Sequence, residues 1–279
     1  MLEKVDLTKK ISKEEYKAKM PQMEIELGRL QRECRELKIP VMIVFEGFGA
    51  SGKGVQIGKL IQSMDPRGFQ VFPIKAETED ERMHPFLWRF WTKTPEAGRI
   101  AIFDGSWYRK VLIDRFEKRT REKEIETAFH SIEAFEKQLT DGGTILVKLL
   151  LDIDQKEQKK RFEKLLEKKE TAWRVSQGDR ERNAKYSEYA AMMEEVLYRS
   201  DTKSAPWTVI EATDRRFATV KIYMTVIHAL AEAVEAVQRR RMEEQAIKAA
   251  EQVSGQQKSC VRQVGNWKCF SHPFSPGQI

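Results

Sequence analysis

The sequence predicts an α/β fold, in which a parallel sheet lies between two layers of helices in a three-layer α/β/α sandwich. Uninterrupted apolar runs recur along the chain, as is typical of strands that are buried on both faces of a parallel sheet. Amphipathic segments long enough for helices separate these runs. Strands that alternate with helices form βαβ units, and such units predict a parallel sheet.

The expected elements follow in chain order. An N-terminal helical extension covers residues 1–38, because apolar residues recur mostly at helical spacing between residues 14 and 37, with Pro21 near the start. The strands are expected at residues 41–45, 70–74, 100–103, 144–151 and 207–210. The helices that cover the sheet are expected at residues 106–118, 123–139, 155–168, 182–199 and 215–237.

The size and composition favour one domain with tails. With 279 residues, of which 41% are hydrophobic and 33% charged, the chain can bury one substantial core. We expect this domain over residues 39–238, followed by a flexible polar tail over residues 239–279. No stretch approaches the roughly 20 apolar residues that cross a bilayer, and the first residues lack the apolar core of a signal peptide. These features predict a cytoplasmic protein without a membrane partner.

The cysteine content and the net charge limit which metals and binding partners are expected. The 3 cysteines are an odd number at wide spacing, so free thiols are expected rather than a disulfide framework. Cys260, Cys269 and His272 could be considered as metal ligands, but their spacing matches no common zinc site. The formal charge of +7 is consistent with a polyanionic partner. A phosphate chain is one such partner, whereas nucleic acid is not expected, because no nucleic-acid-binding motif accompanies the charge.

The strongest signal is the stretch GFGASGKG, which directly follows the first apolar strand and precedes a helical segment. It fits the pattern G-x-x-x-x-G-K in the strand–loop–helix setting that a phosphate-binding loop requires. The loop amides and the positive end of the helix would face an anion, and Lys53 adds a full charge. A turn that merely reverses the chain is the alternative. The pattern predicts a P-loop kinase-like site for phosphoryl transfer, formed by Gly47, Gly49, Ala50, Ser51, Gly52, Lys53 and Gly54.

The metal ligand that is usual in such loops is missing, because Gly54 stands where a Ser or Thr hydroxyl would bind Mg²⁺. Asp104 ends the apolar run at 100–103, and an acid at this point can hold Mg²⁺ directly or through water. The plainer role for this aspartate is a helix N-cap, and both roles can hold together. We therefore predict Mg²⁺ as cofactor and Asp104 as its ligand.

The stretch KKETAWRVSQGDRERNA, residues 168–184, is polar and positively charged around one tryptophan, and it joins two expected helices. We interpret it as part of a helical lid over phosphates at about residues 168–200, with a solvated turn between helices as the alternative. Earlier in the chain, Trp88, Phe90 and Trp91 are expected to pack in a helix rather than to stack on a base.

Several motifs carry a family resemblance. They read FEGFGASGKG, MDPRGF, TEDERMHPFLWRFW, GRIAIFDGSWY, TAWRVSQGD, YRSDT and APWTVIEATDRRFA, and they run from about residue 10 to 236. In this order they resemble the polyphosphate kinase 2 family, and particularly a domain of its polyphosphate:AMP phosphotransferase branch.

The resemblance implies transfer of a phosphoryl group between inorganic polyphosphate and a nucleotide of the AMP, ADP or GDP class, with Mg²⁺ and without a covalent protein intermediate. It implies that Lys53 binds the transferring group and that Asp104 anchors the metal. It also implies that Arg174 closes over the phosphates and that Asp179 organises the closed lid. By charge and position only, further candidates for the phosphate path are Arg109, Arg115, Arg182 and Arg199. A homo-oligomer is expected as well.

Two positions depart from the family's pattern. The family's loop usually carries Asp at the position of Gly49, and its strand-end motif usually carries Arg at the position of Gly105. The first change removes a carboxylate expected at the metal, and the second removes a cation expected near the phosphates. Glu46 is close in sequence, but it ends the strand, so the direction of its side chain is open.

Three hypotheses remain. The chain is a polyphosphate-dependent nucleotide phosphotransferase, or an ATP-dependent nucleoside monophosphate kinase with the same loop and lid. Alternatively, it is a catalytically degenerate copy of the domain that holds polyphosphate or supports oligomerisation, as Gly49 and Gly105 suggest. Restoring Asp at position 49 and Arg at position 105 is expected to separate the first hypothesis from the third.

Overall fold

The computed structural model describes the backbone of residues 1–264 and side chains up to residue 248. The chain forms two units, Met1–Val234 and Glu235–Ile279. The described part of the second unit is the later portion of one long helix. Cys269 and His272 lie outside the described residues, as does the side chain of Cys260.

The first unit is built on a five-stranded parallel sheet with the strand order β2-β3-β1-β4-β5. Every residue of β1 is buried, and so is all of β4 beyond its first residue, which explains why these strands read as continuous apolar runs. The predicted α/β fold with a parallel sheet is confirmed. The strands are β1 (Val41–Gly47), β2 (Phe69–Pro73), β3 (Ile100–Asp104), β4 (Ile145–Asp152) and β5 (Trp207–Glu211).

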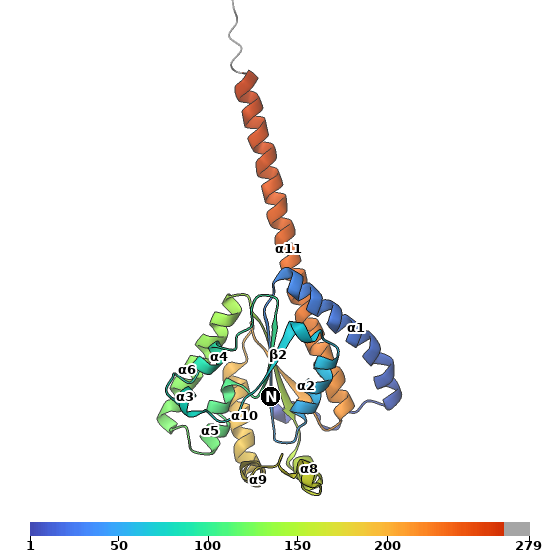
Figure 1. Cartoon of the computed structure of the whole chain (residues 1–279), viewed down its shortest axis with the longest axis vertical. Coiled ribbons are helices and arrows are strands. Elements are labelled where there is room, and N and C mark those ends of the chain that lie inside the picture. The colour runs from blue at the N-terminus through green and yellow to red at the C-terminus, as the bar shows by residue number, and fades with distance from the viewer. Residues whose placement is uncertain (265–279) are drawn as a thin grey trace, which may run out of the picture. The chain divides into compact units, whose positions relative to one another are not determined.

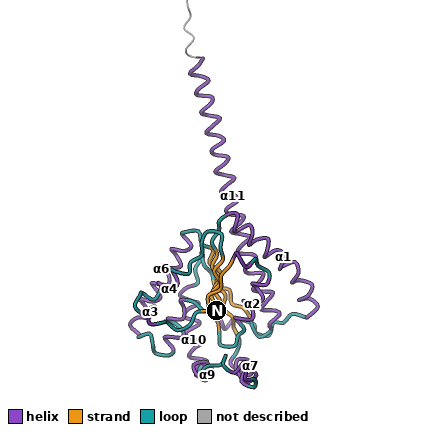
Figure 2. Tube along the Cα trace, in the orientation of Figure 1, coloured by secondary structure: helices purple, strands orange, loops and turns teal. Residues whose placement is uncertain are grey.

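Helices cover both faces of this sheet, which lies between them (Figures 1 and 2). One face carries α1, α2 and the first part of α11, and the other carries α6 and α10 (Figure 1). The 3₁₀ helices are η1 (Leu2–Lys4), η2 (Pro66–Gly68) and η3 (Trp107–Lys110). The α-helices are α1 (Lys13–Leu37), α2 (Lys53–Gln62), α3 (Glu79–Arg82), α4 (Trp88–Trp91), α5 (Ile113–Phe116), α6 (Glu122–Asp141), α7 (Gln155–Leu166), α8 (Lys169–Ala172), α9 (Gln177–Ala184), α10 (Tyr186–Ser200) and α11 (Arg215–Val264).

Two expected helices are each divided into shorter pieces. Residues 106–118 form η3 and α5, separated at Leu112, whose angles of φ −111° and ψ −86° are not helical. Trp107 and Tyr108 are both fully buried, although they are adjacent, so this segment is held by its core contacts rather than by one amphipathic stripe. Residues 182–199 are divided between α9 and α10, with the break at Lys185 (φ −108°, ψ 41°).

The last helix is longer than expected. The sequence predicts that it ends at Val237 and that a flexible tail follows, whereas α11 continues to Val264. The residues after Arg239 are rich in Ala, Glu, Gln and Lys, which favour a helix even without a core to pack on. The expectation for residues 265–279 concerns residues outside those that the structure describes.

The segment Arg215–Lys248 of α11 also contains an 18-residue window with a mean hydropathy of 1.3, which suffices to cross a membrane by length and composition. The expectation that no stretch approaches this length and composition is therefore wrong for this segment. Half of this window is buried inside the structure. Its buried side chains belong to the core and include Val220, Ile222, Tyr223, Val226 and Leu230.

Candidate active site

The phosphate-binding loop lies where β1 ends and α2 begins, and its shape depends on unusual backbone angles. Gly47 has φ +137°, and a Cβ there would lie 2.2 Å from the carbonyl oxygen of Leu151 on β4. Ala50 (φ +57°) and Gly52 (φ +105°) also occupy the left-handed region, and Gly52 is the N-cap of α2. The loop therefore turns tightly against β4 before the helix starts.

Side chains bind all the loop carbonyls from Gly47 to Ser51. Lys53 Nζ donates to the carbonyl oxygens of Gly47 (2.9 Å) and Phe48 (3.4 Å), and Gln158 donates to Gly49 (3.0 Å). Arg161 of α7 donates through Nη1 to Ala50 (3.1 Å) and Ser51 (3.0 Å). Its other terminal nitrogen, Nη2, binds two carbonyls of the turn after β5, those of residues 212 and 213.

This arrangement turns the carbonyls away from the loop's interior and leaves amides available. Among the described hydrogen bonds, none has the amide of Gly52, Lys53 or Gly54 as donor. Amides of the first helical turn have no partner within their own helix, and they carry the positive end of the helix dipole. The start of α2 therefore has the features of an anion-binding site, and Lys53 is held beside it.

Two acidic side chains lie at the ends of neighbouring strands. A Cβ on Gly54 would lie 3.9 Å from Oδ2 of Asp104, so this carboxylate faces the first turn of α2. Glu46 is buried and accepts a hydrogen bond from Ser106 Oγ (2.8 Å). Burial raises the pKa of Glu46, and the charge of Asp104 adds to this rise, while Lys53 and Ser106 oppose it. The N-cap of η3 is Ser106, so the structure does not use Asp104 as that cap.

These residues fit Mg²⁺ only as part of its coordination. No group of three or more His, Cys, Asp or Glu side chains that could hold a metal gathers anywhere in the described part of the chain. Mg²⁺ commonly takes one or two protein carboxylates and completes its shell with water and substrate phosphates. Asp104, with Glu46 as its neighbour, matches this pattern, because the repulsion between two carboxylates favours a cation near them.

A buried ionic cluster holds the turn that follows Asp104. Lys148 of β4 is fully buried and donates to Glu136 of α6 (2.8 Å) and to the Ser200 carbonyl (2.6 Å). The same glutamate accepts from Trp107 Nε1 (2.9 Å) and from the hydroxyl of Tyr108. Sequence analysis missed this cluster, because each member alone reads as an ordinary core or helix residue.

Asp179, in the predicted lid segment, lies against the loop and in the first turn of α9. It forms a capping box with Ser176 and accepts from Arg182 Nη2 (2.8 Å). Burial opposes its ionisation, but the hydrogen bonds from Ser176 and Arg182 outweigh this effect and lower the pKa of Asp179. Arg182 is also bound to Glu117 (2.7 Å), which follows α5. One buried arginine thus ties the predicted lid segment to the residue that follows α5.

The other arginines predicted for the phosphate path differ in their surroundings. Arg115 is bound to Glu195 of α10 (2.5 Å). Arg199 is bound to Glu126 of α6 (2.7 Å) and to Glu195 of its own helix (3.3 Å), and it lies over the ring of Phe129. The remaining two have fewer partners. Arg109 places Nε 3.3 Å from Asp114 without a hydrogen bond, and Arg174 is exposed beside Trp173.

Aromatic residues that the sequence did not single out connect the loop to α10. Phe48 is buried and stacks on Tyr186 at 4.8 Å between ring centroids, with Tyr189 edge-on at 6.0 Å. Tyr189 is buried, and burial raises the pKa of its hydroxyl. The charges that act on it come from both strand-end and lid residues: Arg182, Glu46, Asp179 and Arg109.

The tryptophan-rich segment has packing contacts. Phe90 is buried and lies edge-on to Trp107, with ring centroids 5.8 Å apart, while Trp91 packs edge-on against Phe135 at 4.7 Å. Trp88 stacks on His84 at 4.0 Å.

The two departures from the family's pattern have different surroundings. A Cβ on Gly49 would lie 3.0 Å from Oδ1 of Asp179, so this position faces the lid. Gly105 has φ +75°, and a side chain there would be strained whatever the space around it. The double substitution of Asp at position 49 and Arg at position 105 therefore meets an obstacle at both places, and it is a less direct test than the sequence suggests.

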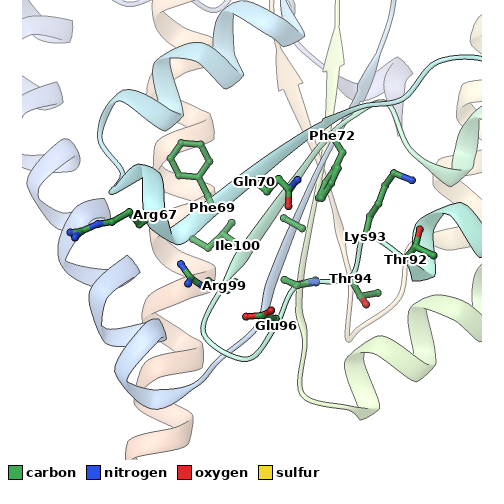
Figure 3. A pocket seen from close by; sticks show the side chains of 12 residues that line it. Arg67, Phe69, Gln70, Phe72, Thr92, Lys93, Thr94, Glu96, Arg99 and Ile100 are labelled. Carbon is green, nitrogen blue, oxygen red and sulfur yellow. The ribbon is translucent and has the colours of Figure 1, made fainter.

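A cavity of about 340 Å³ lies at the other end of the sheet, where β2 and β3 begin (Figure 3). It does not include Lys53 or Asp104, and the chemistry described above lies at the ends where the strands finish. The cavity is lined by Arg67, Phe69, Gln70, Phe72, Thr92, Lys93, Thr94, Pro95, Glu96, Arg99, Ile100 and Ala101.

Comparison with known proteins identifies the family. The family model described as Polyphosphate kinase 2 matches residues 10–240. The chain is 36% identical over 233 residues to a polyphosphate:AMP phosphotransferase of Pseudomonas syringae pv. tomato, covering 84% of this chain and 47% of the relative. It is 35% identical over 230 residues to one of Pseudomonas aeruginosa, covering 82% and 46%. The chain thus spans about half the length of these curated relatives.

A solved structure agrees with this match. The crystal structure of polyphosphate kinase 2 from Arthrobacter aurescens TC1 superposes with a TM-score of 0.78 at 30% sequence identity, covering 83% of this chain and 85% of that chain. The family resemblance drawn from the loop, strand-end and lid motifs is confirmed. The chain belongs to the polyphosphate kinase 2 family.

Proposed function

We propose that this chain transfers a phosphoryl group between inorganic polyphosphate and a nucleoside mono- or diphosphate of the AMP, ADP or GDP class. The observation that carries the proposal is the loop at the start of α2. Its carbonyls are bound to Lys53, Gln158 and Arg161, while the amides of its last residues are available to phosphate oxygens. The curated relatives, whose names join polyphosphate to AMP, support the choice of substrates.

The reaction exchanges one phosphoanhydride bond for another. An oxygen of the nucleotide's terminal phosphate attacks the terminal phosphorus of polyphosphate, a new P–O bond forms, and the bond to the rest of the chain breaks. The shortened polyphosphate leaves with the bonding electron pair. The attacking oxygen is already ionised near neutral pH, so the site needs positioning and charge neutralisation more than a general base.

The chain's own residues supply these two effects. The amides at the start of α2 and the ammonium group of Lys53 bind the transferring phosphoryl oxygens, and Arg174 on the lid adds a cation when the lid covers the phosphates. Asp104, with Glu46 beside it, would hold Mg²⁺. When bound, Mg²⁺ neutralises charge on the bridging phosphate oxygens.

The test is a turnover assay with purified protein, linear polyphosphate, Mg²⁺ and AMP, ADP or GDP, read as nucleotide product. We expect product, and we expect Lys53→Met to reduce the rate by about 100- to 1,000-fold while the fold is kept. An arm with ATP in place of polyphosphate tests the nucleoside monophosphate kinase. Product with ATP and AMP but not with polyphosphate, or no product from folded protein at high concentration, would contradict the proposal.

A second candidate is a degenerate domain that binds polyphosphate without turnover. The position of Gly49 favours it, because the loop offers no carboxylate there and the lid lies against it. Polyphosphate binding that weakens as salt rises, without nucleotide product, would support this candidate. Measuring binding and turnover on the same preparation distinguishes a protein that only binds polyphosphate from one that transfers its phosphoryl groups.

We also propose an oligomeric state and a cellular location for the protein. We expect a homo-oligomer in the cytoplasm with no nucleic-acid partner, and light scattering and cell fractionation would test the first two points.

A further inference from the structure

Position 49 and the lid occupy the same space. A Cβ built on Gly49 would lie 3.0 Å from Oδ1 of Asp179, 3.2 Å from the ring of Phe162 and 3.4 Å from Nε2 of Gln158. The first distance is shorter than carbon–oxygen contacts normally reach, and Phe162 and Gln158 are held in α7, where both are buried. Any side chain at position 49 would therefore push against the lid residue Asp179.

Asp179 is not free to move aside. Its Oδ2 accepts from the amide (3.0 Å) and hydroxyl (2.6 Å) of Ser176 in the capping box of α9. Its Oδ1, the atom that faces Gly49, accepts from Arg182 (2.8 Å). A shift of this carboxylate would cost α9 the side-chain half of its capping box and Arg182 one of its two acidic partners.

The contact also places a cation beside the loop. Arg182 is buried and bridges Asp179 and Glu117. Gly178 leaves room for this bridge, since a Cβ there would lie 2.9 Å from Glu117 and 3.1 Å from Arg182 Nη1. Asn183 at the end of α9 donates to Gln158 (2.8 Å), which itself binds the carbonyl of Gly49. The loop and α9 are thus connected through several side chains.

We infer that the space left by the missing side chain of Gly49 accommodates the carboxylate of Asp179. The site then holds one carboxylate at this point, and the lid supplies it instead of the loop. The inference rests on the proposed function and adds a positioning residue to it. Asp179 acts through Arg182, which it holds beside the phosphate-binding loop while the lid is docked. The absence of a side chain at position 49 is then part of the arrangement of this chain and not a simple loss.

One consequence distinguishes this reading from simple degeneration. Asp at position 49 would place a second carboxylate against Asp179, and the repulsion and the lost space would drive α9 off the loop. The same change would be tolerated once Asp179 is shortened, because Arg182 could then pair with the new carboxylate. The two positions should therefore be strongly coupled.

The experiment compares the natural chain with Gly49→Asp, Asp179→Ala and the double variant. Hydrogen exchange of the amides of residues 177–184 is measured against those of the sheet. We expect Gly49→Asp to speed exchange in α9 by about tenfold, with the sheet unchanged. We expect Asp179→Ala also to speed it through loss of the side-chain half of the capping box, and the double variant to exchange no faster than the faster single variant.

Affinity for linear polyphosphate of defined length gives a second readout. If Asp179 had only a structural role, shortening it would not restore the affinity that Gly49→Asp loses. The double variant is expected to bind more tightly than Gly49→Asp alone. Gly58→Asp is the matched control, because it adds the same charge in α2 where a Cβ would meet no atom within 4 Å, and exchange in α9 should not change.

Unchanged exchange in Gly49→Asp, or additive effects in the double variant, would overturn the inference. Exchange needs no substrate, so these results decide the inference even if the chain forms no nucleotide product. A failure of turnover alone would count against the proposed function but would not affect the inferred contact between Gly49 and Asp179.

Discussion

The predicted phosphate-binding loop and the predicted lid segment come together at Gly49, yet they are held in different ways. The loop is fixed from behind by buried groups, and Arg161, which binds two of its carbonyls, is only 7% exposed. The first two helices of the predicted lid segment, α8 and α9, bury almost nothing. α8 has no buried side chain, and Arg182 is the one buried side chain of α9.

This difference means that the shape of the loop is fixed, whereas the position of the lid can change. Side chains of the domain itself bind the loop's carbonyls, so the amides of its last residues are directed at the predicted anion site. The position of the lid depends instead on a few ion pairs and hydrogen bonds, and such segments have low local stability. Substitutions behind the loop should therefore affect the whole domain, whereas those in the lid should affect opening.

The largest effect is expected for Arg161→Met. Methionine fills part of the volume but leaves four carbonyls, on the loop and on the turn after β5, without their donor. Burying such groups without partners should reduce the free energy of unfolding by about 3 kcal/mol or more. Thermal unfolding would show this as a lower Tm, and affinity for polyphosphate should fall with it.

Arg29→Met is the matched control for this prediction. Arg29 also makes three hydrogen bonds to carboxylates, with Glu26 and Glu33 on α1, but its side chain is 44% exposed. Exposed ion pairs contribute little, so its Tm should barely change. An equal decrease in Tm for the two substitutions would mean that the buried hydrogen bonds of Arg161 contribute no more to stability than the exposed ion pairs of Arg29.

The sheet could be predicted from the sequence because its strands are buried on both faces. The loop could be predicted because Gly47, Gly52 and Lys53 have a spacing that few other structures require. Helix boundaries were harder. The break at Lys185 accompanies a hydrogen bond from Tyr186 to the Ile153 carbonyl (2.7 Å), a long-range contact that no local pattern contains.

The side chains that hold the loop could not be predicted for the same reason. Arg161 lies 110 residues after Ser51 in the chain, and in sequence it is one of many basic residues on an amphipathic helix. The arginines of the expected phosphate path were chosen by charge and position. Arg115 of α5 instead pairs with Glu195 of α10, and Arg199 of α10 pairs with Glu126 of α6, and only the packing of these helices brings the partners together.

A smaller effect is expected at Asp152, which ends β4 just before the chain turns into the helices that carry the lid. Burial raises the pKa of Asp152 to about 6, and the charges of Asp154 and Glu211 add to the rise. Folded Asp152 therefore binds a proton more tightly than it does in the unfolded chain, and its contribution to stability falls as pH increases from about 4 to 6. Asp152→Asn should remove this fall and raise the free energy of unfolding at pH 7 by about 2 kcal/mol.

Denaturant unfolding at several pH values would measure this change. Glu211 titrates with the opposite sign: its pKa is lowered overall, because hydrogen bonds from Lys221 and Lys9 outweigh burial, so its contribution is lost only at lower pH. Asp141→Asn is the control, since Asp141 is 63% exposed. A natural chain whose stability rises between pH 4 and 6 to the same extent as that of Asp152→Asn would contradict the prediction.

The smallest effect on the whole domain, and the sharpest test of the contrast, is expected for Glu117→Gln. The substitution keeps the shape but removes the charge that holds Arg182 from the side of α5. The Tm should change little, because the arginine keeps Asp179, while tryptic cleavage after the exposed Arg180 should become several-fold faster as α9 leaves the loop more often. Glu122→Gln removes an exposed carboxylate that lies 3.7 Å from Arg115, and it should leave cleavage unchanged. Faster cleavage in both variants would mean that general charge, rather than the bridge to the lid, controls opening.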